Sequence, residues 1–179
     1  MSLKSTADRY GVIPLTLHWL SAGLILALIP MGFAMQGATG DLRLGLYRAH
    51  AMAGGLVGIL TLMRIMWWVA LDRKPRASSG APALQRLLAK TVHAGLYGIV
   101  LVLALSGTGL VATSGLGAAL LTSDASLIPA DLSALPPRLA HGLMARLLVG
   151  LLTLHVLGAL YHHWIKRDGT LGRMLPQVR

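Results

Sequence analysis

The sequence contains neither cysteine nor glutamate. Without cysteine there can be no disulfides, cysteine-bound zinc, iron–sulfur clusters, thiolate nucleophiles or covalent haem attachment through a C-x-x-C-H motif. Acidic residues are scarce: six aspartates stand against sixteen lysines and arginines in 179 residues, a net charge of +10. Only 12% of the residues are charged, whereas 55% are hydrophobic and the mean hydropathy is +0.66. This composition excludes an ordinary soluble domain and indicates an integral membrane protein.

Four apolar runs are each long enough to cross about 30 Å of hydrocarbon as an α-helix. They cover residues 15–35, 49–70, 89–113 and 139–164. Three segments connect these runs. Residues 36–48 are a polar stretch, and residues 71–88 are a basic loop rich in Pro, Ser and Gly. Residues 116–137 are a semi-apolar surface element that ends at two prolines. The sequence therefore predicts an all-α fold, a four-helix transmembrane bundle that forms a single domain over residues 1–179.

Charge predicts how the bundle is oriented. Four spans place both termini on one side of the membrane, and that side carries twelve basic and three acidic residues. The other side carries four basic and three acidic residues. Because cytoplasmic segments are enriched in Lys and Arg, we expect both termini to be cytoplasmic. The basic residues flank apolar runs and do not form one polar face, so we expect membrane lipid and not nucleic acid as the partner.

The last span is apolar, yet it carries four of the seven histidines: His141, His155, His162 and His163. Ionisable residues inside a membrane span are rare and generally functional. His141 and His155 are fourteen residues apart, which corresponds to about 21 Å of helical rise and a difference in azimuth of roughly 40°. Both rings therefore face the same side of the bundle, one near each membrane surface.

Two further histidines lie at matching depths. In the predicted topology His18 lies near the start of the first span, close to the cytoplasmic face, and His155 lies in the cytoplasmic half of the last span. His50 begins the second span near the periplasmic face, at the depth of His141. We expect the pairs His18–His155 and His50–His141 to supply the axial nitrogens of two non-covalent b-type haems, with iron bound by two histidines each.

Other interpretations of these residues stay open. A histidine near the headgroups is often only a hydrogen-bonding side chain, and His93, His162 and His163 are open to that interpretation. Gly54 and Gly58 share the face of His50 and indicate either close helix packing or room for a porphyrin. A zinc or copper transporter would be expected to place acidic partners in the bundle, and the predicted spans contain none. A cofactor-free transporter is the remaining alternative.

Four stretches of the sequence resemble the bacterial cytochrome b561 family, and they are spread over all four predicted spans. They read LTLHWL at residues 15–20, RAHAMAG at 48–54, LAKTVHAGLYG at 88–98 and LHVLGALYHHWIKRDGTLGRMLP at 154–176. The resemblance implies a four-helix inner-membrane protein with two b-type haems on His18, His50, His141 and His155. That family includes a superoxide oxidase that passes electrons from periplasmic superoxide to ubiquinone.

The resemblance thus implies that this chain is a superoxide:ubiquinone oxidoreductase. The alternative is a passive cytochrome b subunit that serves a soluble redox partner. We expect His162, seven residues beyond His155, to donate protons to a quinone, with Trp19 as an apolar wall. Arg48 and Arg146 are candidates for binding haem propionates or for steering superoxide. Lys90 and His93 are candidate propionate contacts at the cytoplasmic end.

Overall fold

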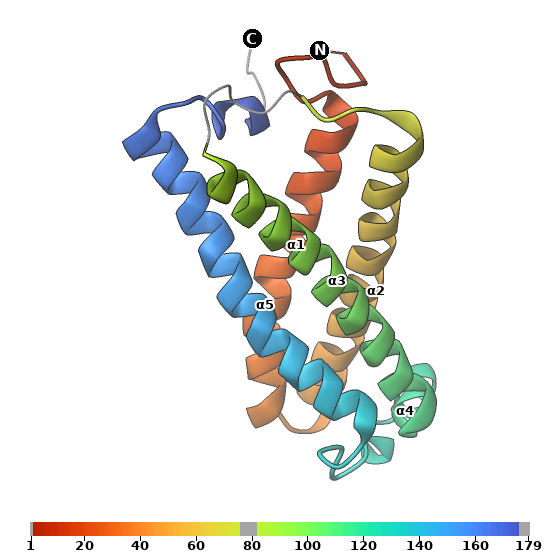
Figure 1. Ribbon diagram of the computed structural model, residues 1–179. Helices are drawn as coiled ribbons and strands as arrows, with labels where there is room; N and C mark the ends of the chain where they lie inside the picture. Colours follow the sequence, from red (N-terminus) through yellow and green to blue (C-terminus); the bar gives the residue numbers. More distant parts are fainter. Residues whose placement is uncertain (1, 76–81, 176–179) are drawn as a thin grey trace.

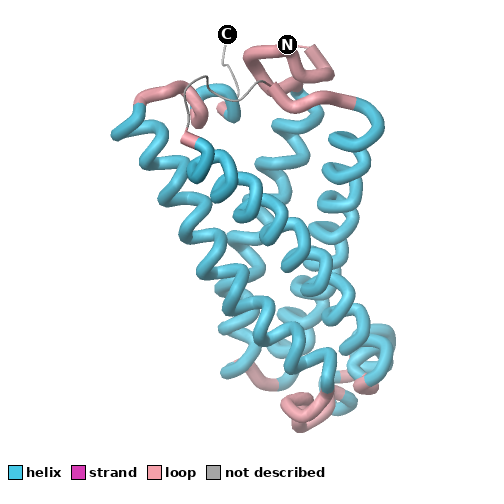
Figure 2. Tube along the Cα trace, in the orientation of Figure 1, coloured by secondary structure: helices cyan, strands magenta, loops and turns pink. Residues whose placement is uncertain are grey.

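The computed structural model describes residues 2–75 and 82–175, and within this part of the chain all regular structure is helical. Four long helices form a bundle (Figures 1 and 2). They are α1 (Val12–Gly37), α2 (Gly40–Met66), α3 (Ala83–Thr113) and α5 (Pro136–Leu160). Each is long and apolar enough to cross a membrane, so the prediction of four membrane-spanning helices is confirmed.

Shorter helical segments extend or connect these helices. α2 continues as a π-helical segment, Trp67–Leu71, and α5 continues as another, Tyr161–Lys166. The connection between α3 and α5 contains α4 (Leu116–Thr122) and a 3₁₀ turn, Ala125–Leu127. α5 begins at Pro136 and not at residue 139; it starts at the two prolines where the surface element was expected to end, because proline fits the first turn of a helix where no intrahelical donor is needed.

Two predicted boundaries were wrong. The polar stretch 36–48 is mostly helical, since α2 begins at Gly40 and only two residues separate it from α1. Hydropathy marks where a helix enters lipid, but the helix itself can continue into water, and Asp41 suits the first turn of α2. α3 begins at Ala83 and not at residue 89, directly after Pro82. Residues 76–81 of the predicted loop lie outside the described residues.

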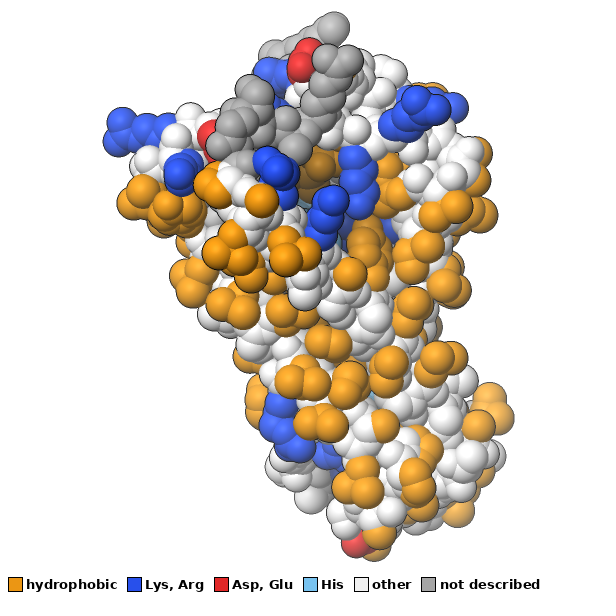
Figure 3. All heavy atoms as spheres, in the orientation of Figure 1, with side chains coloured by type: hydrophobic (Ala, Val, Ile, Leu, Met, Phe, Trp, Pro, Cys, Tyr) orange, Lys and Arg blue, Asp and Glu red, His pale blue; other side chains and the backbone are white. Residues whose placement is uncertain are grey.

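α3 packs along α5, α1 along α2, and α2 against α3. Val57, Val100 and Leu148 form the buried centre of the bundle. Many other large apolar side chains point outward, for example Leu105, which is 73% exposed. Hydrophobic side chains cover the middle of the molecule, while Lys and Arg gather toward its two ends (Figure 3). This distribution is typical of a bundle that faces lipid.

The first and last described segments lie at the same end of the bundle (Figure 1). Trp19 Nε1 in α1 donates to the carbonyl oxygen of Met174, 2.6 Å away, which fixes the C-terminal segment over α1. Asp72 accepts hydrogen bonds from the Ser5 amide at 2.9 Å and from Trp67 Nε1 at 3.0 Å. These bonds hold the N-terminal segment over the end of α2.

Candidate cofactor site

The structure brings together both predicted histidine pairs. α1 starts at the end of the bundle where the termini lie (Figure 1), and His18, near the start of α1, faces His155 of α5 with 6.4 Å between the ring centres. α2 starts at the opposite end, and His50, in the first half of α2, faces His141 of α5 with 6.1 Å between the ring centres. All four rings are partly buried. α5 therefore contributes one ring to each pair, and α1 and α2 contribute the others.

The separation within each pair fits an iron atom between the two rings. Two metal–nitrogen bonds of about 2 Å, plus about 1 Å from each nitrogen to its ring centre, give about 6 Å. Glycine lies beside both rings of the second pair. A Cβ atom at Gly32 would lie 3.6 Å from His50 Cε1, and one at Gly107 would lie 3.4 Å from His141 Cε1. The residues present thus fit a flat, bis-histidine haem.

The ring of His141 is held in the tautomer that an iron ligand needs. Its Nδ1 lies 3.1 Å from Ser106 Oγ, and that hydroxyl donates its own hydrogen to the Leu103 carbonyl oxygen. The ring must therefore donate from Nδ1, which leaves the lone pair of Nε2 free for a metal. Within the described residues, no three His or Asp side chains form a group that could hold a metal ion.

His93 lies beside the first pair without matching its geometry. Its ring centre is 5.1 Å from that of His155, which is about 1 Å too short for an iron atom to lie between the rings. Its Nδ1 donates to the Ala89 carbonyl oxygen at 2.5 Å. His93 is exposed, as is Lys90 one turn earlier in α3.

His162 lies in a hydrogen-bonded group at the same end of the bundle. Its Nδ1 donates to Asp168 Oδ2 at 2.5 Å, and Gln85 Nε2 of α3 donates to its Nε2 at 2.7 Å. Partial burial alone would raise the pKa of Asp168, but hydrogen bonds from Thr170 and His162 lower this pKa to about 2. Asp168 is therefore ionised at neutral pH and fixes the orientation of the His162 ring.

Sequence reasoning did not identify Asp168, Gln85 or Ser106 as part of these groups. Asp168 follows His162 by six residues, beyond the end of the apolar run. The chain turns back there because Arg167 adopts a left-handed conformation with φ of 52°. Neither Gln85 nor Ser106 belongs to a motif, so only the packing of α3 against α5 reveals these contacts.

The remaining predicted residues differ in what they contact. Arg48 donates to the Leu120 carbonyl oxygen and, at 2.7 Å, to Ser123 Oγ, so it fastens α4 to α2. Arg146 is exposed on α5. The Trp19 ring meets the His18 ring edge-on, with centres 5.2 Å apart.

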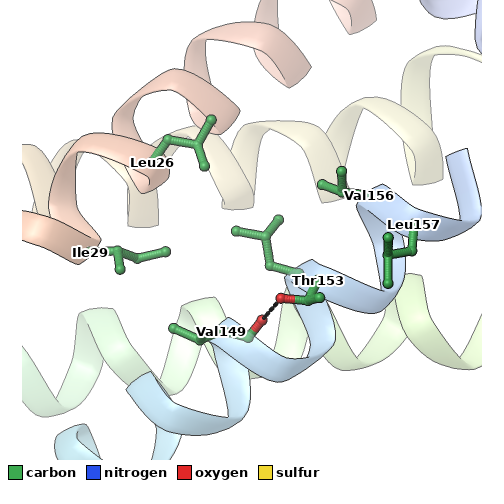
Figure 4. A pocket seen from close by; sticks show the side chains of 7 residues that line it. Leu26, Ile29, Val149, Thr153, Val156 and Leu157 are labelled. Atoms are coloured by element: carbon green, nitrogen blue, oxygen red, sulfur yellow. Dashed lines mark hydrogen bonds between the residues drawn. The ribbon is translucent and has the colours of Figure 1, made fainter. Parts of the chain in front are cut away.

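An apolar cavity of about 320 Å³ lies between α1 and α5, and none of the four paired histidines lines it. Leu26 and Ile29 of α1 face Val149, Thr153, Val156 and Leu157 of α5 across it (Figure 4). The Thr153 hydroxyl is already bonded to the Val149 carbonyl oxygen. The cavity offers no charged group or histidine, so it is not a candidate for holding iron.

Comparison with known proteins agrees with this geometry. The family described as "Prokaryotic cytochrome b561" matches residues 9–177. The chain is 31% identical over 182 residues to "Cytochrome b561 homolog 2" of Escherichia coli (strain K12), covering 98% of this chain and 95% of that protein. It is 28% identical over 176 residues to "Cytochrome b561 homolog 1" of the same organism, covering 95% and 98%. The chain therefore belongs to the prokaryotic cytochrome b561 family, whose members are membrane cytochromes that bind b-type haem and transfer electrons.

Proposed function

We propose that this cytochrome is a superoxide:ubiquinone oxidoreductase of the bacterial inner membrane. One observation carries the proposal: a facing histidine pair lies at each end of the bundle, and the carboxylate-bound His162 lies at one of these ends. Such a protein can accept electrons at one membrane face and deliver electrons and protons at the other. The charge bias of the sequence, twelve basic residues against four, favours cytoplasmic termini and hence a cytoplasmic His162.

In this proposal His18 and His155 bind one b haem, and His50 and His141 bind a second. When bound, these groups supply one-electron redox chemistry. Two imidazoles per iron leave no open coordination position, so substrates exchange electrons without binding to iron. The protein's own contribution is to hold the rings at the right spacing and to shape what can approach each end.

At the cytoplasmic end, His162 is the proposed proton donor to ubiquinone. Its Nδ1 is bonded to Asp168, so Nε2 is the nitrogen that can pass a proton to a quinone carbonyl. Gln85 now occupies that position and can present either end of its amide, donating to a neutral Nε2 or accepting from a protonated one. Trp19 would form an apolar wall of the site, and Lys90 and His93 would contact haem propionates.

At the periplasmic end the proposed donor is superoxide, a small anion. Two superoxide anions would each lose one electron and leave as dioxygen, while ubiquinone takes up two electrons and two protons to become ubiquinol. Arg146 is exposed on α5, five residues after His141, and its positive charge can attract an anion toward this end. Arg48 supports this end in a different way, because its bonds to Leu120 and Ser123 hold α4 in place.

The test is to mix the purified protein, loaded with haem, with a superoxide generator and a ubiquinone analogue. We expect ubiquinol to form faster than with a haem-free sample, and His162→Ala to slow its formation at least tenfold while haem content is unchanged. His163→Ala is the matched control, because this exposed neighbour has no contact with Asp168.

Three outcomes would overturn the proposal. If ubiquinol forms no faster than in the haem-free sample, a passive cytochrome that serves a soluble redox partner becomes the better assignment. If both histidine variants slow the reaction equally, the quinone site does not depend on His162. A sample without any b-type band in its reduced-minus-oxidised spectrum would show that the protein does not bind haem.

A further inference from the structure

Arg64 is a charged side chain turned into the interior of a membrane-spanning bundle. It lies near the end of α2, where a long side chain could have reached outward to the headgroups. Instead, its terminal nitrogen lies 3.2 Å from His18 Nδ1, and its guanidinium carbon lies 5.2 Å from the centre of the Tyr97 ring. Its Nε is buried and has no hydrogen-bond partner. The positive charge therefore lies between α1, α2 and α3.

Within residues 2–75 and 82–175, no carboxylate compensates this charge. The chain has no glutamate, and none of its six aspartates, all within the described residues, lies within 4 Å of the guanidinium. The Tyr97 ring face attracts a cation, but this attraction is weaker than an ion pair. A buried guanidinium normally requires an anion because removing it from water is costly. The structure thus points to an anion that the described part of the chain does not supply.

Haem binding makes this need stronger. Arg64 can donate to His18 Nδ1 only while the proton of that ring is on Nε2. A histidine that binds iron through Nε2 carries its proton on Nδ1 instead. Both facing groups would then be donors, and Arg64 would lose its acceptor at the moment of loading. The missing acceptor must therefore arrive together with the cofactor.

We propose that Arg64 binds a carboxylate of the haem held by His18 and His155. This inference depends on that pair holding a haem, but not on superoxide or ubiquinone being substrates. Haem b carries two propionate carboxylates, and the guanidinium fork fits a carboxylate through two parallel hydrogen bonds. Arg64 would thus be an anion-binding residue in the bundle interior, beside the axial ligand.

The experiment compares wild type, Arg64→Gln, Arg64→Lys and Arg73→Gln, each checked first for haem content. Redox titration of the purified cytochrome, without quinone or superoxide, gives the midpoint potential of each haem. Infrared difference spectra of protein carrying haem isotope-labelled at its carboxyl carbons report those carboxylates directly. Arg73 is the control because it is exposed to water at the same end of the bundle.

We expect Arg64→Gln to lower the midpoint potential of one haem and to shift one label-sensitive carboxylate band. Loss of a nearby positive charge favours the oxidised iron, and loss of the guanidinium changes the bonding of the carboxylate. Arg64→Lys should restore most of the potential, and Arg73→Gln should change neither signal. Label-sensitive bands that are identical in wild type and Arg64→Gln would overturn the proposal, as would an effect equal to that of Arg73→Gln. If Arg64→Gln loses haem, Arg64→Lys is compared with wild type instead, by the midpoint potential and by the label-sensitive carboxylate band.

Discussion

Ser106 Oγ lies 3.1 Å from His141 Nδ1, and the hydroxyl hydrogen is committed to the Leu103 carbonyl oxygen, also 3.1 Å away. This contact joins α3 to α5 and leaves His141 with a free lone pair on Nε2. Mutation of groups of this kind, which orient a metal ligand through its other nitrogen, typically lowers metal affinity by about 10–100-fold. The arrangement leads directly to a first prediction.

Ser106→Ala should weaken haem binding at the His50–His141 pair by about tenfold or more, because the His141 ring loses the acceptor that fixes its orientation. Transfer of haem from the purified variant to an acceptor protein measures the effect. Thr108→Ala, which removes an exposed hydroxyl of the same helix bonded only to its own helix, is the control. Equal rates of haem loss in both variants would contradict the prediction.

His141→Ala and His155→Ala should each reduce the haem content from two per chain to one. Each variant removes one ring of a facing pair and leaves the other pair intact. Pyridine haemochrome analysis against protein concentration gives the ratio, and the optical bands show which haem remains. A ratio of two in either variant would show that the ligands are assigned wrongly.

Gly58→Ala should destabilise the bundle by about 1–3 kcal/mol, because a Cβ atom there would lie 2.8 Å from the Cβ of Ala104 in α3 and force α2 and α3 apart. Thermal unfolding in detergent measures the loss. Gly54→Ala is the matched control, since a Cβ atom at this position meets nothing within 4 Å. Of the two roles open to these glycines, close packing applies to Gly58. A Gly54 variant that is equally unstable would exclude this explanation.

Asp168→Asn should remove a pH-dependent contribution to stability. The pKa of Asp168 is lowered from 3.8 to about 2, so the carboxylate stabilises the folded chain fully above about pH 4. The contribution is lost as the pH falls toward 2, where the folded protein also takes up the proton. The difference in melting temperature between wild type and Asp168→Asn should therefore shrink as the pH falls from about 4 toward 2. A difference that grows as the pH falls would have the wrong sign.

The helices and the histidine pairs could be predicted from the sequence because the membrane restricts the possibilities so strongly. A span must be helical, a helix has a fixed rise, and a histidine in lipid must face the interior. Spacing alone therefore placed His141 and His155 at the two ends of one face. The partners His18 and His50 followed from the direction in which each span crosses the membrane.

The start of α2, the contact of Asp168 and the direction of Arg64 could not be predicted, because the helical periodicity of the sequence does not determine them. The start of α2 at Gly40 lies outside lipid, where hydropathy no longer distinguishes helix from loop. Asp168 reaches His162 only because the chain reverses at Arg167, after the helical period has ended. Arg64 could equally have turned outward or inward, and its direction is decided by Tyr97 and His18 on neighbouring helices.

The bond between Trp19 and Met174 has a practical meaning for anyone who attaches a reporter to this protein. A fluorescent domain fused to the C-terminus would follow a segment bonded to Trp19, whose ring meets His18, and its bulk would hinder any molecule that approaches this end of the bundle. The connection around Ser123 lies at the far end of the bundle, so a small label placed there would leave the end with the termini free.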